Sequence, residues 1–289
     1  MKKLFKNRIS MICAICLVAS MASGFASAEI TDSDTSSSSY SEVVPMYING
    51  IKMSDGIRVE DTTYIPLKTF FESIGEQTNI VWDGETGTVS VTGEGLELTA
   101  SVGNKYITVN NRCLYVPYGI LNLDGSVAAP VRELAKIYQV EVSWDEVTAS
   151  VSLNADRPQL FENGDAFYDK QDLYWLSHLI NAESGNQSLE GKIGVGNVVM
   201  NRVADPTCPD TIYGVIFDAK YGVQFSVTQT GSIYGEPNEE SVVAAKICLE
   251  GYNIVGNSIY FVNPEVGLTS WFTNTRVYVS TIGEHDFYA

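Results

Sequence analysis

One short pattern occurs twice in the first half of the chain and limits what that half can fold into. "YIPLKTFFESIG" is followed by "IVWDGETGTVSV", and "AAPVRELAKIYQ" is followed by "VEVSWDEVTASVSL". In each copy a proline opens a short helix, an alternating strand ends in Trp-Asp, and a turn with threonine leads to a closing strand. Two such units with a period of about 60 residues predict a duplicated small α+β module over residues 46–153.

This repeated pattern resembles the stalk modules called copper amine oxidase N-terminal domain-like. The resemblance rests on "YIPLK" and "IVWDGETGTVSV" and covers residues 46–153. A copper site needs imidazole ligands, and residues 29–153 contain no histidine, so no copper is expected. Trp82 and Trp144 are predicted to be core residues, with sugar-stacking platforms as the alternative. The module is therefore expected to be a spacer or wall-associating part without chemistry of its own.

The first 28 residues have the pattern of a secretory signal peptide. A basic start with Lys2, Lys3, Lys6 and Arg8 precedes an apolar run, and "ASA" ends at Ala28, where cleavage is expected. A permanent membrane anchor is disfavoured because the apolar run is short and no stop-transfer pattern follows. No other stretch of the sequence is long and apolar enough to span a bilayer.

Two segments separate the expected domains. Residues 29–45, "EITDSDTSSSSYSEVVP", are rich in Ser, Asp and Thr and predict a disordered tether. Residues 154–170 predict a linker to a second domain over residues 171–289. Directly after the tether, the Asn-Gly pair in "MYINGIKM" predicts a β-hairpin.

The charge of the chain excludes one class of partner. Loss of residues 1–28 removes four of the 18 basic residues and none of the 35 acidic ones, which leaves a formal charge of −21. Nucleic acid is therefore not expected as a partner, because its phosphates need a basic surface. Attachment to an anionic polymer would likewise need a shaped groove rather than charge alone.

The cysteines and histidines predict no metal site. Cys113, Cys208 and Cys248 remain after cleavage, and an odd number excludes complete pairing, although a disulfide between Cys208 and Cys248 stays open. The two histidines, His178 and His285, have no cysteine cluster near them in the sequence, so a zinc site is not expected. No role is assigned to His178.

The segment "QDLYWLSHLINAESGN" has the spacing of a helix with one buried face. Leu173, Leu176 and Ile180 follow one another at helical intervals, and the next position on this face is Glu183. Burial and the negative end of the helix dipole both disfavour a carboxylate at this place. The sequence therefore predicts a raised pKa for Glu183.

A glutamic acid that stays protonated near neutral pH is the proton donor that glycosidic cleavage requires. The ordinary alternative for any glutamate near a helix end is a solvated side chain. The place of Glu183 on the apolar face favours the catalytic interpretation.

A second helix is predicted for "SLEGKIGVGNVVMNRV", with Ser188 as its N-cap. Glu190 and Lys192 are expected on its more exposed side. No strand precedes the helix and no Gly-Lys-Ser/Thr follows its glycines, so the glycines predict close helix packing rather than a phosphate-binding loop.

The stretch "INAESGNQSLEGKIGVGNVVMNRV" resembles the opening of the SleB/CwlJ-type cell wall hydrolases, the spore cortex-lytic enzyme family. The family pattern E-[AS]-x-G-x-x-x-x-G-x-x-x-V-x-x-V-x-x-N-R includes the catalytic glutamate, which corresponds to Glu183, while Asn186 departs from the pattern. The other matching positions are Ser184, Gly191, Val195, Val198, Asn201 and Arg202. Further matches follow in "QFS", "GYNIVGNSIYFVNP" and "IGEHDFYA", at residues 224–226, 251–264 and 282–289.

This resemblance implies a lysozyme-like domain, mainly helical with a small β element, that has a sugar-binding cleft. The implied reaction is cleavage of the MurNAc-GlcNAc β-1,4 bond of peptidoglycan by a lytic transglycosylase. Glu183 would protonate the leaving oxygen and then act as base toward the C6 hydroxyl of the same muramic residue. One carboxylate is sufficient for this route, whereas a hydrolase needs a second one, for which Glu190 and Asp205 are the nearest candidates in the sequence.

The same resemblance implies substrate-binding residues. Gln224 and Ser226 would hydrogen-bond the N-acetyl or hydroxyl groups of the glycan, and Phe225 would pack beneath a sugar. Tyr260 would orient the acid or bind the glycan, and His285 would line the cleft. Ordinary roles in a turn or in the core remain open for all five residues.

The expected protein is thus a secreted, cell wall-associated α+β enzyme of two domains, a duplicated stalk module followed by a mainly helical lysozyme-like domain. Its expected partner is the glycan strand of peptidoglycan, and no cofactor is expected. A muramidase-type hydrolase and a non-catalytic wall-binding surface protein are the alternatives.

Overall fold

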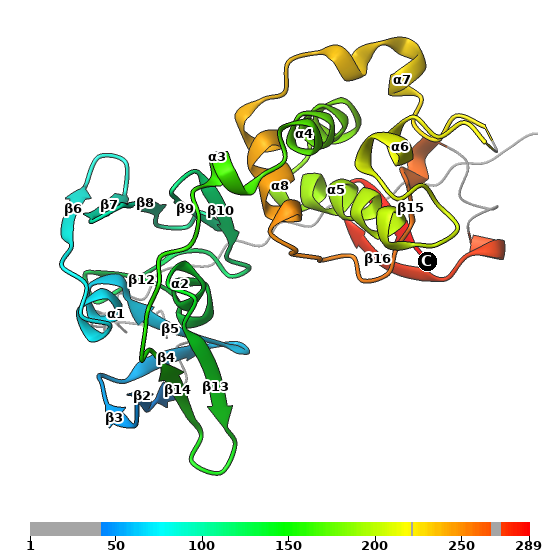
Figure 1. Ribbon diagram of the computed structural model, residues 1–289. Helices are drawn as coiled ribbons and strands as arrows, with labels where there is room; N and C mark the ends of the chain where they lie inside the picture. The colour runs from blue at the N-terminus through cyan, green and yellow to red at the C-terminus, as the bar shows by residue number, and fades with distance from the viewer. Residues whose placement is uncertain (1–41, 221, 267–272) are drawn as a thin grey trace, which may run out of the picture. The chain divides into compact units, whose positions relative to one another are not determined.

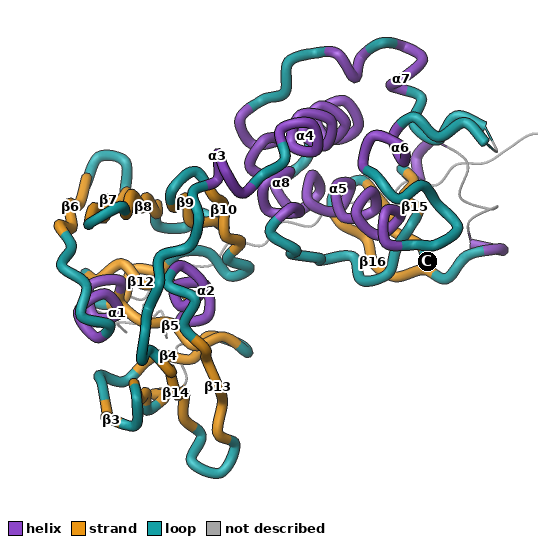
Figure 2. Tube along the Cα trace, viewed as in Figure 1, coloured by secondary structure: helices purple, strands orange, loops and turns teal. Residues whose placement is uncertain are grey.

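The computed structural model describes residues 42–220, 222–266 and 273–289 (Figures 1 and 2). The predicted signal peptide over residues 1–28 lies outside the described residues. None of the described helices has the length and apolar character needed to cross a membrane.

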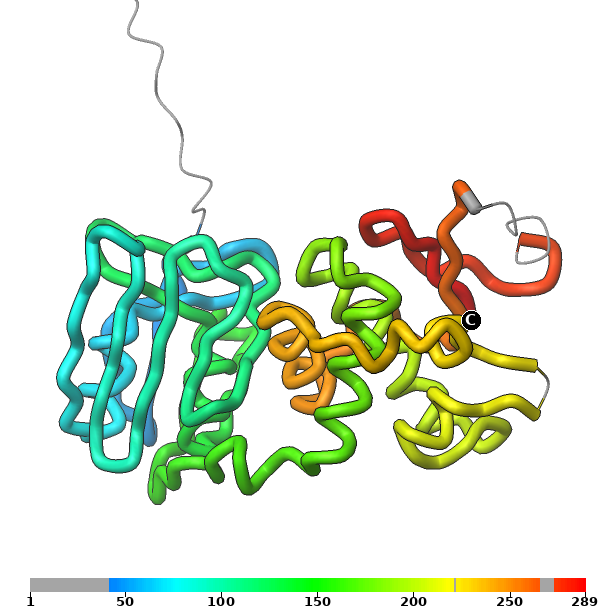
Figure 3. The backbone as a smooth tube through the Cα atoms, turned by 90° about the horizontal axis from the view of Figure 1, so that it is seen from above, coloured from blue at the N-terminus to red at the C-terminus, as the bar shows by residue number. Residues whose placement is uncertain are grey.

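Three sheets and two short helices form the first half of the described chain. The first sheet has the order β1-β4-β5-β12-β11, formed by Glu42–Val44, Gly56–Val59, Thr62–Pro66, Ser126–Pro130 and Leu121–Leu123. The second has the order β10-β9-β8-β7-β6, formed by Arg112–Tyr115, Tyr106–Val109, Leu96–Ser101, Thr88–Gly93 and Asn79–Asp83. The strands of this second sheet, in cyan to green, run side by side in Figure 3.

The third sheet has the order β13-β14-β2-β3, formed by Glu141–Asp145, Ser150–Asn154, Met46–Ile48 and Ile51–Lys52. Its β14 and β2 pair in parallel, whereas the other pairs of the three sheets are antiparallel. Asn49 and Gly50 join β2 to β3 with positive φ angles of 49° and 78°, as a two-residue hairpin turn requires. The predicted hairpin is confirmed.

The disordered tether predicted for residues 29–45 does not extend to its predicted end. Val43 of β1 is in register with Ile57 of β4, and Val44 is buried. The short apolar pair Val43-Val44 adds an edge strand to the first sheet, which the Ser-rich composition before it concealed. The tether up to residue 41 lies outside the described residues.

The same order of elements occurs twice in this half of the chain. Strand β5, helix α1 (Leu67–Ser73), β6 and β7 are matched by β12, helix α2 (Val131–Ile137), β13 and β14. Pro66 and Pro130 are the N-cap residues of the two helices, with φ angles of −55° and −58°. The duplication as such stays a prediction.

The aspartate of each Trp-Asp motif accepts hydrogen bonds from the turn that follows it. Asp83 accepts hydrogen bonds from the Glu85 N–H at 2.9 Å and from Thr86 Oγ1 at 2.7 Å. Asp145 accepts from the N–H groups of Val147 and Thr148 at 2.8 and 3.2 Å. The aspartate thus holds the tight turn between two strands.

The two tryptophans of these motifs are not core residues. The exposed fractions of Trp82 and Trp144 are 48% and 36%, so their predicted core role is wrong. Both residues lie on edge strands, β6 and β13, which are largely exposed. The alternating pattern identified the strands correctly, but it could not show that the tryptophans lie on their open side.

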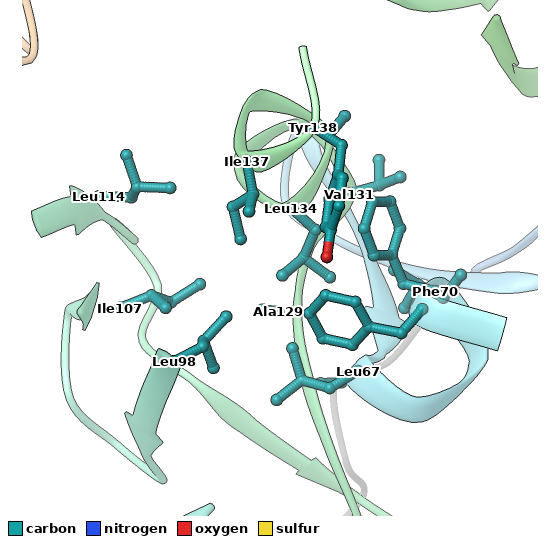
Figure 4. Packing of buried hydrophobic residues seen from close by; sticks show 14 of the residues in the cluster. Leu67, Phe70, Leu98, Ile107, Leu114, Ala129, Val131, Leu134, Ile137 and Tyr138 are labelled. Carbon is teal, nitrogen blue, oxygen red and sulfur yellow. The ribbon is translucent and has the colours of Figure 1, made fainter. Parts of the chain in front are cut away.

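The core of this half lies between the helices and the sheets (Figure 4). Leu67 and Phe70 of α1 and Leu134 of α2 are fully buried. They pack in one cluster with Leu98 of β8 and Ile107 of β9. The two helices that the repeated pattern predicted therefore bury one apolar face each against the sheets.

The predicted linker over residues 154–170 is packed rather than loose. Phe161 is buried in the core of the first half, and Tyr168 is also buried. The segment contains the short helix α3 (Gly164–Phe167), and a Cβ atom on Gly164 would lie only 2.5 Å from the Asn111 carbonyl oxygen. The polar composition of this segment gave no indication of these contacts.

Strand β10 contributes to a second buried cluster in the unit that holds residues 39–289. The Arg112 guanidinium donates to both carboxylate oxygens of Glu250 at 2.8 and 2.6 Å, and the Tyr168 hydroxyl donates to Oε1 of Glu250 at 2.6 Å. Cys113 and Tyr115 of β10 belong to the same cluster as Ile247 of helix α8 (Glu239–Leu249).

Helices dominate the second half of the chain (Figure 2). They are α4 (Lys170–Ser184), α5 (Leu189–Ala204), α6 (Ile212–Ile216), α7 (Val227–Thr230) and α8 (Glu239–Leu249), with the 3₁₀ helices η1 (Ser232–Tyr234) and η2 (Pro264–Val266). A three-stranded antiparallel sheet has the order β15-β17-β16, formed by Tyr260–Val262, His285–Tyr288 and Tyr278–Ile282. This half is thus helical with a small sheet, and its likeness to lysozyme stays a prediction.

Glycines allow α5 to approach its neighbours closely, as the sequence predicted. A Cβ atom on Gly196 would lie 2.6 Å from Cys248 Sγ of α8 and 2.9 Å from Ile180 Cδ1 of α4. A Cβ atom on Gly194 would lie 2.6 Å from the ring of Phe287 in β17. The helix therefore has no room for a larger side chain at either position.

Gly196→Ala is expected to destabilise the protein, because the added methyl group must displace packed side chains. Overpacking costs about 1–3 kcal/mol, which exceeds the gain of up to about 1 kcal/mol in helix propensity. The matched control is Gly84→Ala, whose Cβ would meet only Trp82 Nε1, at 3.5 Å. Chemical denaturation would measure both variants, and equal stabilities would contradict the packing role.

One residue of α5 departs from its predicted environment. Lys192 was expected on the exposed side of the helix, but its exposed fraction is 3%. Its ammonium group donates to the Gln187 carbonyl at 2.7 Å and pairs with Glu240 of α8. The aliphatic part of the side chain is buried while the charge is satisfied at its end, an arrangement that the polar identity of lysine does not reveal.

Candidate active site

Glu183 lies in the last turn of α4, on the face that Leu176 and Ile180 bury. Its side chain is half-buried, and among the described residues its carboxyl group has no hydrogen-bond or ion-pair partner. Burial raises the pKa of Glu183 to about 6, in the direction that the sequence predicted. The group can therefore hold a proton close to neutral pH and give it away.

The end of α4 is fixed from outside the helix. Asn181 Oδ1 accepts hydrogen bonds from the Asn238 N–H at 3.1 Å and from Ser241 Oγ at 3.3 Å. The Asn238 side chain donates in turn to the Gly185 carbonyl at 3.0 Å. These bonds hold the helical turn that contains Glu183 against the start of α8.

The turn between β16 and β17 contacts the chain just after α4. Gln187 Oε1 accepts a hydrogen bond from the Glu284 N–H at 3.2 Å, and a Cβ atom on Gly283 would lie 2.6 Å from the same oxygen. Gly283 and Glu284 form the turn between β16 and β17 and precede His285. Gln187 thus links the hairpin that carries His285 to the segment that follows Glu183.

Helix α5 carries a row of polar side chains that bind the loop before β15. Asn197 Nδ2 donates to the Tyr252 carbonyl at 2.7 Å, and its Oδ1 accepts from the Ile254 N–H at 2.9 Å. Asn201 donates to the carbonyls of Gly256 and Ser258, each at 2.8 Å, and Arg202 Nε donates to the Ile259 carbonyl at 2.7 Å. The Asn-Arg pair of the sequence motif therefore has a clear structural task, which is to shape this loop.

The three residues of the "QFS" motif occupy different environments. Gln224 is exposed, and its amide donates to the Gly222 carbonyl at 2.9 Å. Phe225 is buried, with its ring 5.2 Å from the Arg202 guanidinium. Ser226 is exposed at the start of α7, where its hydroxyl makes no capping hydrogen bond. Gln224 and Ser226 are thus free to contact a ligand, whereas Phe225 can act only as support.

Tyr260 and His285 come from neighbouring strands of the small sheet, β15 and β17. The Tyr260 hydroxyl accepts a hydrogen bond from Arg276 Nη2 at 3.1 Å. His285 is buried, its ring lies 5.1 Å from that of Phe261, and its Nδ1 has no partner among the described residues. Burial lowers the pKa of His285, so the imidazole is neutral near pH 7.

A pocket of about 490 Å³ brings two of the predicted site residues together. Gln224 and Tyr260 line it with Arg202, Asp218 and Cys208. Glu183 is not among its lining residues. The second half of the described chain therefore contains a polar pocket with an arginine in its wall. That Glu183 acts together with Gln224 and Tyr260 stays a prediction.

The two nearest candidates for a second catalytic carboxylate have structural partners. Glu190 forms an ion pair with Lys105. Asp205 accepts hydrogen bonds from the hydroxyl and N–H groups of Thr207 at 2.6 and 2.8 Å, which lower its pKa. Neither environment resembles that of Glu183.

His178, to which no role was assigned, stacks on the Tyr174 ring at 3.9 Å, with Nδ1 2.8 Å from the Tyr174 carbonyl. All three cysteines of the described chain are free, so Cys208 and Cys248 do not pair. Within the described ranges no group of three His, Cys, Asp or Glu residues could hold a metal ion.

Sequence patterns did not identify two of the residues that shape this region. Asn181 and Asn197 both use the two ends of their amide groups to hold neighbouring segments. For Asn197, a polar residue at a buried helical position was the available indication. The same indication was followed only for Glu183.

Two family models match separate parts of the chain. The model described as Cell Wall Hydrolase matches residues 186–288, and its range begins three residues after Glu183. The model described as Copper amine oxidase N-terminal domain matches residues 47–153. Both are the families that the sequence motifs indicated.

Curated relatives and solved structures match the second half. The chain is 31% identical over 120 residues to the spore cortex-lytic enzyme of Bacillus cereus and 27% identical over 120 residues to that of Bacillus subtilis. These matches cover 42% of this chain, and 45% and 38% of the two relatives, so the chain spans less than half of their length. The catalytic domain of the germination-specific lytic transglycosylase SleB from Bacillus anthracis is 31% identical, with a TM-score of 0.39, over 45% of this chain and 100% of that chain.

Proposed function

We propose, from the membership of residues 186–288 in the cell wall hydrolase family and their homology to the spore cortex-lytic enzymes, that this protein cleaves the glycan strands of peptidoglycan. The observation that carries the proposal is the half-buried carboxyl group of Glu183, which has no partner among the described residues and whose pKa is raised to about 6. A binding protein would gain nothing from a carboxyl group kept in this unfavourable environment.

The reaction we infer is that of a lytic transglycosylase at the MurNAc-GlcNAc β-1,4 bond. Glu183 gives its proton to the glycosidic oxygen as the bond to C1 of the muramic residue breaks. The resulting carboxylate then takes the proton of the C6 hydroxyl of the same residue, whose oxygen bonds to C1 and closes a 1,6-anhydro ring. Glu183 is protonated again at the end, so one carboxyl group completes the cycle.

The route through a single acid is favoured over hydrolysis by the environments of the other carboxylates. A hydrolase of this bond needs a second carboxylate to activate water or to attack C1. The two candidates nearest in the sequence, Glu190 and Asp205, are engaged with Lys105 and Thr207. A muramidase-type hydrolase remains the second candidate.

Product analysis distinguishes these reactions. Residues 29–289 would be incubated with purified peptidoglycan, and the released fragments would be identified by mass spectrometry. We expect 1,6-anhydro-muropeptides. Fragments with reducing ends would show the hydrolase instead, and the absence of released fragments would contradict enzymatic function.

The pH dependence of the rate is expected to follow the acid form of Glu183. Because the group must be protonated to act, kcat/KM should fall as the pH rises through the pKa of about 6. Initial rates on peptidoglycan between pH 4 and 8 (about two units on either side of this value) would measure the decline. A rate that stays constant to pH 8 would contradict the assignment.

The organisation of the chain belongs to the same proposal. Residues 1–28 serve as a signal peptide that directs the protein out of the cell, and residues 46–153 form a stalk. Residues 171–289 form the catalytic domain, where Gln224, Ser226 and Tyr260 bind the glycan. Support for the proposed roles comes from the exposure of Gln224 and Ser226 and from the pocket that Gln224 and Tyr260 line.

A further inference from the structure

A second polar pocket lies in the first half of the chain. Its volume is about 270 Å³, and its lining residues come from strands β4, β5, β13 and β14 and helix α2. Arg58, Arg132 and Trp144 supply its polar and aromatic wall, and Val131 and Val151 are among its apolar residues. Two arginines are unusual neighbours in a chain that has only 18 basic residues against 35 acidic ones.

Arg58 is held in place by its Nε and Nη1 atoms, and it keeps further N–H donors for a ligand. Its guanidinium carbon lies 5.6 Å from the centre of the Trp144 ring, and Nε donates to the Glu60 carbonyl at 3.1 Å. Nη1 makes an exposed ion pair with Glu42 at 3.4 Å, which contributes little and can be exchanged for another anion. Within the described chain no acceptor binds Nη2.

Arg132 is the less engaged of the two arginines. Its side chain is exposed, and it makes neither an ion pair nor a hydrogen bond among the described residues. The one acidic lining residue, Asp61, accepts hydrogen bonds from Thr62 Oγ1 at 3.0 Å and from the Tyr118 hydroxyl at 3.1 Å. The three charged lining residues, Arg58, Arg132 and Asp61, thus carry one net positive charge, and Arg132 makes no ion pair within the described chain.

The remaining wall defines the shape of a suitable ligand. Val131, Val142 and Val151 line the pocket beside the Trp144 ring, which is 36% exposed. An anion with a small apolar group attached would place its charge between the arginines and its apolar part against these valines. Planar guanidinium groups bind carboxylates with two parallel hydrogen bonds, which makes a carboxylate the fitting anion.

We propose that this pocket binds a peptide carboxylate that carries a small apolar side chain, as the stem peptides of peptidoglycan present at their D-alanine ends. The first half of the chain would then hold the protein on its substrate, in addition to acting as a spacer. This inference rests on the proposed function for the choice of ligand, whereas the pocket and its charge do not depend on catalysis.

The test is a binding measurement that needs no turnover. Isothermal titration would be carried out on residues 29–289 with the E183Q substitution and with N-acetyl-D-alanyl-D-alanine as the probe. Three comparison ligands would be titrated in the same way. They are the C-terminal amide of the dipeptide, which lacks the negative charge, N-acetylmuramic acid, which presents a carboxylate on a sugar, and chitotetraose, which is a neutral glycan. We expect the dipeptide acid to bind and its amide to bind at least about tenfold more weakly.

Variants of the pocket provide the second part of the test. R132Q and R58Q are each expected to weaken binding of the dipeptide acid about tenfold, the loss of a hydrogen bond to a charged group. W144A should weaken it as well, because it removes both the apolar wall and the support of Arg58. R157Q removes an exposed arginine outside the pocket and should leave the affinity unchanged, as should W82A.

Several results would overturn the proposal. They are the absence of dipeptide binding, equal binding of acid and amide, dipeptide binding that R132Q and R58Q do not change, and binding of N-acetylmuramic acid or chitotetraose that is tighter than that of the dipeptide and is weakened by R132Q and R58Q. None of them depends on glycan cleavage. Failure of this inference is therefore distinguishable from failure of the proposed function, which product analysis of the unsubstituted chain decides.

Discussion

Glu183→Gln is expected to lower the rate of glycan cleavage by about 10²–10⁴-fold, the usual contribution of a positioned general acid. Glutamine keeps the size and hydrogen-bonding ability of the side chain but cannot give up a proton. The measurement is the release of muropeptides from peptidoglycan under single-turnover conditions. Wild-type turnover by the variant would show that another group donates the proton.

The same substitution is expected to stabilise the folded protein near pH 7. The folded pKa of Glu183, about 6, lies above the ordinary value of 4.5, so the folded state prefers the protonated form. The contribution of Glu183 to stability is therefore greatest below pH 4.5 and falls as the pH rises through 6. This difference between the folded and the ordinary pKa corresponds to a loss of up to about 2 kcal/mol in the free energy of unfolding when Glu183 is ionised. Glutamine avoids this loss because it cannot ionise.

Glu190→Gln is the matched control for both effects. It makes the same change from acid to amide at a residue that is ion-paired with Lys105, seven positions further along the chain. Cleavage should remain within about threefold of wild type, because no proton transfer is assigned to this group. A loss of activity equal to that of Glu183→Gln would favour a mechanism with two carboxylates.

Asn197→Ala is expected to cost about 2–5 kcal/mol of folding free energy, a large share of the total for a domain of this size. The amide satisfies two backbone groups, the Tyr252 carbonyl and the Ile254 N–H, and its own exposed fraction is 1%. Alanine would leave both backbone groups without these partners. Urea unfolding would measure the loss as a lower midpoint with an unchanged slope.

Asn257→Ala serves as the control in the same loop. Asn257 is exposed and makes no hydrogen bond with the described residues. Its replacement should change the free energy of unfolding by less than about 0.5 kcal/mol. If both variants had equal stabilities, the bonds of Asn197 to the loop would not be an important source of stability.

Local patterns predicted the elements of this protein well where the reason for the pattern is itself local. Pro66 and Pro130 fix the helix starts through their own φ angles, and Asn49-Gly50 fixes a turn through positive φ. The raised pKa of Glu183 followed from helical periodicity, because Glu183 shares a helix face with the buried residues Leu176 and Ile180. These predictions needed no knowledge of distant residues.

Predictions that depended on packing between distant segments were less successful. Trp144 was predicted in the core, although it borders an open pocket. Lys192 was predicted in solvent, although it is buried and forms an ion pair with Glu240, 48 positions away. Asn197 was not identified because its partners are backbone atoms more than 50 positions later. Periodicity defines which residues share a face, but it does not define what covers that face.

The three free cysteines of the described residues make the folded state accessible to a chemical probe. Cys248 and Cys113 are buried, and burial raises the pKa of the Cys113 thiol to about 11, whereas Cys208 is half-buried. A maleimide should therefore modify the native chain at Cys208 and reach the other two thiols only after unfolding. Mass shifts of the two peptides that contain Cys248 and Cys113, collected over time, would then report opening around α8 and β10 separately, without any added reporter group.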